Sequence, residues 1–257
     1  MSPVGAITRK EIRSYFVSPI AYVVAAVFLL LIGLLSYLAV LSVSNRSLQM
    51  LRLQGNMPEL NVNEMVFRPV FENMAVVMLL VVPILTMRLL AEEKKLKTME
   101  LLLTSPVTIA DIVLGKFFAA FTIFAGMLAL TASGALALVP FAEFRWTPIL
   151  TAYLGTLLLG GLFLSAGLFA SSLTENQIIS IMLSFGFLLI IWLFGWAGQL
   201  FSDTVLGAIL TYLSPIDHFL NMIKGLIETK DLVYFLAGIT FSLFLTYRVI
   251  ESQRWRS

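Results

Sequence analysis

The 257-residue sequence contains no cysteine, a single histidine and few charged residues. Without cysteine the chain has no disulfide framework, thiolate nucleophile or zinc ribbon. Acidic and basic residues together make up 12% of the chain, whereas soluble proteins carry about a quarter. The net charge of +2 is too small to indicate a nucleic-acid partner. These absences exclude an ordinary water-soluble globular protein.

Hydrophobic residues are abundant instead, at 59% of the chain, and the mean hydropathy is +0.95. The charges are clustered, so the uncharged stretches between them are long enough to cross a bilayer as helices. We therefore predict an all-α, polytopic membrane protein with a single domain over residues 1–257. Six transmembrane helices are expected, over residues 20–43, 72–91, 117–141, 147–171, 177–200 and 232–249. A seventh apolar run, over 204–216, is short and contains Pro215, so we interpret it as interfacial or re-entrant.

The lysine and arginine residues set the expected orientation, because short cytoplasmic loops carry an excess of them. With the N-terminus inside, eleven of these residues fall on inner segments and six on outer segments. An even number of spans returns the chain to its starting side. We therefore expect both termini in the cytoplasm.

The residues before the first span form an expected amphipathic helix. Its apolar positions recur at helical spacing: Val4, Ile7, Ile12, Tyr15 and Phe16. The basic residues Arg9, Lys10 and Arg13 lie away from that face. A helix of this kind lies along the inner membrane surface. The alternative is an ordinary juxtamembrane anchor with no role in binding a partner.

The loop between the second and third spans carries the most informative pattern. Glu93 and Lys97 stand four residues apart with the acid first, which favours a helix that continues out of the second span. An apolar stripe on this helix is formed by Leu96, Met99, Leu102 and Leu103. Pro106 ends the helix, and Thr108 with Asp111 forms a capping box that begins the next one. An exposed apolar stripe with a charged rim is typical of a docking surface, although a solvated connector is the alternative.

The chain lacks the residues of several enzyme and transporter classes. Its Gly115-Lys116 pair is followed by Phe117, and Ala110 stands where a Walker A loop has its first glycine, so no such loop is present. The lone His218 cannot form a His-x-x-x-His pair, and we expect no catalytic residue, metal site or bound cofactor in this chain. The expected spans contain no ionisable residue near mid-membrane, which disfavours an ion-coupled carrier. Energy for transport must then come from another subunit.

A second amphipathic helix is expected before the sixth span. Ser214 and Pro215 supply a capping serine and a proline at the first helical position, and Asp217 places an acid in the first turn. Polar and apolar residues then occupy opposite faces as far as Glu228, which indicates a helix at the outer interface. Pro215, Asp217 and His218 are candidates for an outer gate, and a re-entrant packing element is the alternative.

Several motifs resemble the permease subunits of ABC-2-type exporters, especially the gliding-motility-associated (GldF-like) and copper-maturation (NosY-like) permeases. The inner motifs are AEEK at 91–94, TMELLLTSPV at 98–107 and GK at 115–116. The outer motifs are VFRPVFEN at 66–73 and LSPIDHF at 213–219. The resemblance covers essentially the whole chain, and its inner motif is the more specific.

This resemblance implies an exporter permease in the bacterial cytoplasmic (inner) membrane, with an N-terminal connecting helix and a cytoplasmic coupling helix in the loop over 92–116. A separate ABC ATPase, which binds ATP and Mg, would dock on the coupling helix. The other implied partners are a second permease copy or paralogue, an outer-facing auxiliary subunit and membrane lipid. The implied coupling residues are Glu92, Glu93, Leu96, Lys97, Thr98, Met99, Glu100, Leu103, Ser105 and Pro106. A membrane scaffold that recruits a cytoplasmic partner and a secondary carrier stay as alternatives.

Overall fold

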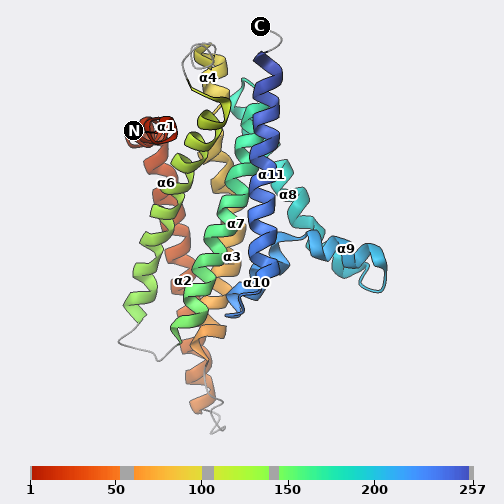
Figure 1. Cartoon of the computed structure of the whole chain (residues 1–257). Coiled ribbons are helices and arrows are strands. Elements are labelled where there is room, and N and C mark those ends of the chain that lie inside the picture. The colour runs from red at the N-terminus through yellow and green to blue at the C-terminus, as the bar shows by residue number, and fades with distance from the viewer. Residues whose placement is uncertain (1, 53–60, 100–106, 139–144, 255–257) are drawn as a thin grey trace.

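A computed structural model describes residues 2–52, 61–99, 107–138 and 145–254, and every structural statement below concerns these parts of the chain. They form a bundle of helices with no strand among the described residues (Figure 1). The elements are α1 (Pro3–Val17), α2 (Pro19–Arg52), the π-helical turn η1 (Asn63–Phe67), α3 (Arg68–Thr86), α4 (Ala91–Lys95), α6 (Ile109–Leu138), α7 (Trp146–Ser172), α8 (Gln177–Leu200), α9 (Val205–Leu213), α10 (Pro215–Ile223) and α11 (Thr229–Arg254).

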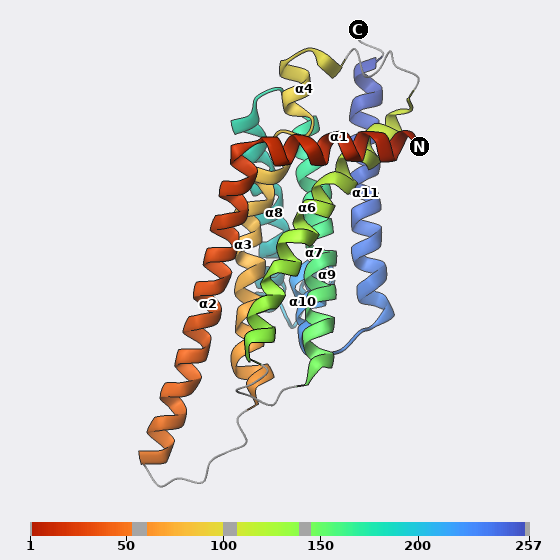
Figure 2. The same cartoon turned by 90° about the vertical axis from the view of Figure 1, so that its left-hand side faces the viewer.

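Six of the described helical stretches are long and apolar enough to cross a membrane, and they contain α2, α3, α6, α7, α8 and α11. They run alternately up and down the bundle, so α1, α4 and the last turns of α11 share one end (Figures 1 and 2). We call this the proximal end and the opposite one, where α7 begins, the distal end. The prediction of an all-α protein with six membrane-spanning helices is confirmed.

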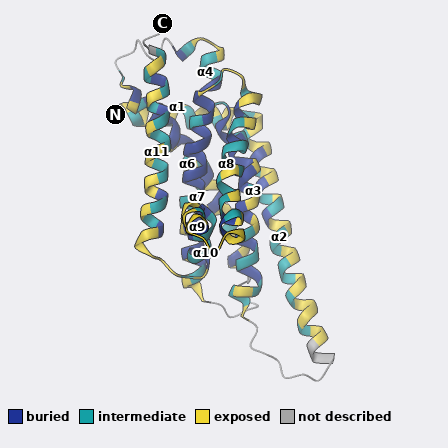
Figure 3. Ribbon diagram, turned by 90° about the vertical axis from the view of Figure 1, so that its right-hand side faces the viewer, coloured by how far each residue is buried: buried dark blue, intermediate teal, exposed yellow. Residues whose placement is uncertain are grey.

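The core lies between α3, α6 and α7, where buried residues are concentrated (Figure 3). A Cβ atom at Gly160 of α7 would lie 2.2 Å from the Phe124 ring of α6, so this glycine is what allows the two helices to meet. In contrast, α2, α8 and α11 expose many apolar side chains on the outside of the bundle. Exposed apolar side chains on membrane-spanning helices are the surface expected to face lipid.

α1 lies across the proximal end, nearly perpendicular to the spans (Figure 2). Val4, Ile7, Ile12 and Tyr15 are half-buried against the bundle, while Arg9, Lys10 and Arg13 are exposed, as the sequence predicts. Phe16 is the exception among the expected apolar positions, because its side chain is 60% exposed. The chain turns at Ser18 into α2, so α1 and α2 form an elbow.

α9 packs against the end of α8 and projects sideways from the bundle, and α10 lies against α7 and α8 in the distal half (Figure 1). α9 is too short to span a membrane, in agreement with the interfacial or re-entrant interpretation of 204–216. α10 buries Phe219, Met222 and Ile223 against the bundle. It ends at Ile223, before the expected limit at Glu228, and Gly225 follows with a φ of 87°.

Candidate functional site

The segment after α3 does not continue as one helix, contrary to the prediction. α3 ends at Thr86, a turn follows, and the short α4 ends at Lys95. Ser171 of α7 explains the turn, because its hydroxyl accepts the N–H groups of Leu90 at 3.1 Å and Ala91 at 3.0 Å. The same hydroxyl donates to the Met87 carbonyl at 3.1 Å. α7 therefore satisfies the backbone groups that a continuous helix would have paired internally.

A buried ion cluster joins α1, α4 and α6 at the proximal end. The Lys116 ammonium of α6, 1% exposed, lies 3.0 Å from Glu11 of α1 and 3.0 Å from Glu93 of α4. The exposed Lys10 approaches Glu93 at 3.6 Å and makes the group of four side chains neutral. A buried charge is tolerated only when it is paired, so these contacts hold the three elements together.

Glycine beside this lysine allows α1 to lie against α6. A Cβ atom at Gly115 would come within 2.7 Å of Ile7 Cγ2 and 3.2 Å of the Val4 carbonyl. The Thr8 hydroxyl donates to the Gly115 carbonyl at 3.1 Å. Gly115-Lys116 resembles a fragment of a phosphate loop in the sequence, but in the structure it is the part of α6 against which α1 packs.

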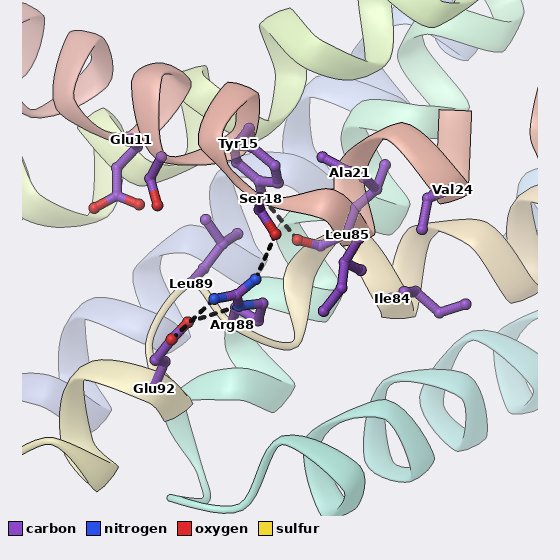
Figure 4. A pocket seen from close by; sticks show the side chains of 12 residues that line it. Glu11, Tyr15, Ser18, Ala21, Val24, Ile84, Leu85, Arg88, Leu89 and Glu92 are labelled. Atoms are coloured by element: carbon purple, nitrogen blue, oxygen red, sulfur yellow. Dashed lines mark hydrogen bonds and ion pairs between the residues drawn. The ribbon is translucent and has the colours of Figure 1, made fainter. Parts of the chain in front are cut away.

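A second set of contacts ties the elbow to the turn after α3. Arg88 binds both carboxylate oxygens of Glu92, with Nε at 2.7 Å and Nη2 at 3.0 Å, and its Nη1 donates to Ser18 at 2.7 Å (Figure 4). The Tyr15 hydroxyl donates to the Leu85 carbonyl at 2.7 Å. Desolvation and the nearby Glu11 carboxylate raise the pKa of Tyr15, so this hydroxyl stays protonated as a donor. These side chains surround a pocket of about 50 Å³.

The tip that follows α4 projects from this braced base. Leu96 is 63% exposed, and Lys97 is exposed with a left-handed φ of 56°. Met99, in contrast, is buried in the core of the bundle. The predicted stripe is therefore wrong for these two residues, which do not share a face. Glu100, Leu102, Leu103, Ser105 and Pro106 lie outside the described residues.

The other predicted coupling residues lie beneath this tip. The predicted Glu93–Lys97 pair is wrong, because Glu93 turns to Lys116 and Lys10. Glu92 binds Arg88, and the Thr98 hydroxyl donates to the Glu93 carbonyl at 3.3 Å. Lys94 donates to the Ser172 carbonyl of α7. The acidic residues thus brace the segment from inside and leave Lys95, Leu96 and Lys97 on its surface.

The start of α6 is confirmed as a capping box. The Thr108 backbone N–H donates to the Asp111 carboxylate at 3.0 Å, and the Asp111 N–H donates to the Thr108 hydroxyl at 3.1 Å. This pattern depends only on residues three apart in the sequence, which is why it could be predicted locally.

His218, one of the three distal gate candidates, is buried. Nδ1 of His218 lies 2.6 Å from the Asp231 carboxylate of α11, and Nε2 lies 3.0 Å from the Tyr212 carbonyl of α9. Because a carbonyl oxygen only accepts, the contact with Tyr212 needs a hydrogen on Nε2, and Nδ1 faces the Asp231 carboxylate at hydrogen-bond distance. The Tyr234 ring stacks on the imidazole at a centroid distance of 4.1 Å. His218 therefore links α9, α10 and α11.

The two other distal candidates have different surroundings. Pro215 is buried at the first position of α10, as expected. Ser214 does not cap α10 with its side chain, contrary to the prediction. Its hydroxyl instead faces α8, where a Cβ atom at Gly195 would lie 2.7 Å from it and 3.4 Å from Asp217 Oδ2. Asp217 thus turns toward α8 and away from the contacts that hold His218.

Sequence comparison assigns the fold just described to a known family. The family described as ABC-2 family transporter protein matches residues 5–250. The chain belongs to the ABC-2 transporter family. A search of curated proteins found no match to it. The match includes α1, the braced α4 segment and the distal helices, so the elements of the candidate site are parts of the family domain.

Several residues of the site in this ABC-2 family protein were missed by the sequence analysis. Glu11 and Lys116 are 105 positions apart, and no spacing rule connects them. Ser171 lies 80 positions from Ala91, and nothing in the sequence near it indicates this partner. Asp231 sits at the start of the sixth span and was not treated as buried. Glu11 lies on the apolar face of the amphipathic helix, and this position was a sign in the sequence that the acid has a buried partner.

Proposed function

We propose that this chain is the transmembrane permease subunit of an ATP-driven ABC exporter. The observation that carries the proposal is the braced segment at the proximal end. α1, α6 and α7 all hold α4 through the contacts of Glu93, Arg88 and Ser171. A loop anchored on three sides can transmit a displacement to the spans, which a loose connector cannot do.

The proximal end is proposed to face the cytoplasm of a bacterial cytoplasmic membrane. Ten of the sixteen lysine and arginine residues that the structure describes belong to segments at that end, and cytoplasmic segments carry such an excess. A cytoplasmic ABC ATPase would then meet the exposed tip of Lys95, Leu96 and Lys97. ATP and Mg would bind to that separate subunit, because the sequence of this chain has no Walker A loop.

A second permease copy or paralogue is proposed to complete the translocation path. Six spans are few for an enclosed pathway, and both α2 and α8 expose rows of apolar side chains. Two permeases and two ATPases would move an amphipathic substrate outward or transmit force to an auxiliary subunit at the distal end. The exposed apolar surface of α2 and α8 supports such pairing, which competes with lipid for the same faces.

The experiment measures the affinity of the ATPase for the chain in detergent. Leu96→Ala removes an exposed apolar side chain from the tip, and loss of a buried leucine contact costs about 1.5–3 kcal/mol. We expect the ATPase to bind roughly 10- to 100-fold more weakly. Leu173→Ala is the matched control, because Leu173 is 44% exposed and belongs to the nearby α7–α8 turn. Equal affinities for wild type and Leu96→Ala would contradict the docking role.

A passive scaffold predicts a different result in the same complex. The scaffold binds the ATPase without changing its turnover, whereas a permease subunit changes the hydrolysis rate when both proteins are reconstituted. Met99→Asp serves as a fold control, because Met99 is buried and its replacement should lower the yield of folded chain before it affects affinity.

A further inference from the structure

An open groove of about 670 Å³ lies along the elbow between α1 and α2, beside the turn that joins α3 to α4. Three cationic side chains, two serine hydroxyls and an apolar edge line it, and none of its lining residues is acidic. The residues that matter here are Lys10, Arg13, Ser14, Ser18, Ile20 and Arg88. The cations come from α1 and from the turn after α3, so the fold itself gathers them.

The orientation of the two helices relates the groove to the membrane surface. α1 runs across the bundle and α2 runs along it (Figure 2), and an amphipathic helix next to a span is expected to lie at the level of the lipid headgroups. Ile20, Val23 and Val27 follow on α2 with exposed fractions of 42%, 60% and 47%. Their spacing places them on one helix face. A cationic groove therefore opens directly onto an apolar, lipid-exposed face.

We propose that this groove binds an acidic phospholipid. Its phosphate lies among Lys10, Arg13 and Arg88, and an acyl chain follows the face that begins at Ile20. The combination selects a lipid over a soluble anion, because a free phosphate gains nothing from the apolar face. Charge complementarity selects an acidic headgroup over a zwitterionic one.

The hydrogen-bonding capacity of the groove fits a phosphate. Arg88 has five N–H donors and uses three of them on Glu92 and Ser18, which leaves two (Figure 4). Arg13 is exposed at the rim, and Lys10 has only long contacts, at 3.6 Å with Glu93 and 3.9 Å with Glu11. Guanidinium groups bind phosphate oxygens in pairs, and the serine hydroxyls can donate to the remaining ones.

A lipid bound in the groove would affect α4 through Arg88. The same guanidinium that meets the phosphate holds Glu92 of α4. A bound lipid therefore adds a charge-assisted partner to the network that braces the tip. This inference does not depend on the ATPase, so it can fail or succeed independently of the proposed function.

The experiment measures how much phosphatidylglycerol stays bound to the purified full chain, by native mass spectrometry, against phosphatidylcholine. Arg13→Gln and Arg9→Gln each remove one exposed positive charge from α1, but only Arg13 lines the groove. We expect Arg13→Gln to lower phosphatidylglycerol affinity about tenfold, as for loss of a charged hydrogen bond. Arg9→Gln should change it less than about twofold.

Three outcomes would overturn the proposal. Equal losses in Arg13→Gln and Arg9→Gln would show a general effect of surface charge. Equal retention of phosphatidylcholine and phosphatidylglycerol would show no selection for an acidic headgroup. Displacement of the lipid by millimolar inorganic phosphate would show a phosphate site in which the acyl chain has no part.

Discussion

Lys116 holds a buried ammonium that balances carboxylates from two other elements. Its partners, Glu11 and Glu93, have side chains only 13% and 12% exposed. Removing one member of a buried ion group leaves the others uncompensated, which costs more than the intact group contributes. The structural role of this lysine is therefore larger than that of the many exposed lysines in the chain.

We expect Lys116→Met to destabilise the folded chain by about 3–5 kcal/mol, because the two largely buried carboxylates then share only the exposed Lys10 as a cation. Lys95→Met, at an exposed lysine of α4, should change stability by less than about 0.5 kcal/mol. Denaturation in mixed micelles measures both. Adding Glu11→Gln and Glu93→Gln to Lys116→Met should restore most of the loss, and a triple variant as unstable as the single one would count against the charge argument.

Asp231 is the corresponding buried polar residue at the distal end. Its carboxylate is fully buried beside His218. Asp231→Ala removes the partner of Nδ1 and should cost about 1–3 kcal/mol. Asp231→Asn should cost less, because its carboxamide can donate to Nδ1 while Nε2 still donates to Tyr212. Thermal unfolding compares both with Asp203→Ala at an exposed aspartate. Equal losses in the two Asp231 variants would show that filling space matters there and hydrogen bonding does not.

At the scale of elements, local patterns could be predicted from the sequence and long-range ones could not. The capping box at Thr108 formed because both partners belong to one helical turn. The helix expected to continue from α3 did not form, because Ser171 takes two of its N–H groups and Met99 turns into the core. Helical spacing cannot reveal a competing partner on another helix, and tertiary contacts decided the outcome.

The close packing of α1 on α6 at Gly115 can be tested by substitution. Gly115→Ala places a methyl group 2.7 Å from Ile7 and 3.2 Å from the Val4 carbonyl, so α1 must move. We expect a loss of about 1–3 kcal/mol and faster proteolysis within α1. Gly126→Ala is the control in the same helix, because nothing lies within 4 Å of its added Cβ. That variant should be neutral or slightly stabilising, and similar behaviour of the two would contradict the described packing.

For the whole molecule, the count of spans and the fold class were predictable because they depend on hydropathy and length along the chain. The amphipathic α1 and the short distal helices follow from the same kind of periodicity. The sites depend on contacts between helices far apart in the sequence, such as Lys116 with Glu11, and spacing along the chain does not reveal such pairs. Helical spacing alone placed Arg9, Lys10 and Arg13 correctly on an exposed surface, and Leu96 is exposed as expected.

The most direct test of the account is photo-cross-linking in cells at two exposed positions on opposite ends of the bundle. A benzophenone amino acid at Leu96 lies on the proximal tip. One at the exposed Asn61 lies at the distal end, because Asn61 starts the turn of η1 and the nearby Asn63 binds the backbone of Arg145, just before α7. We predict that the Leu96 probe forms an adduct with a polypeptide that carries a Walker A loop, and that the Asn61 probe does not. An ATPase adduct at Asn61 would contradict the proposed docking at the proximal end. So would the absence of an adduct at Leu96 when the chain is folded and co-purifies with the ATPase.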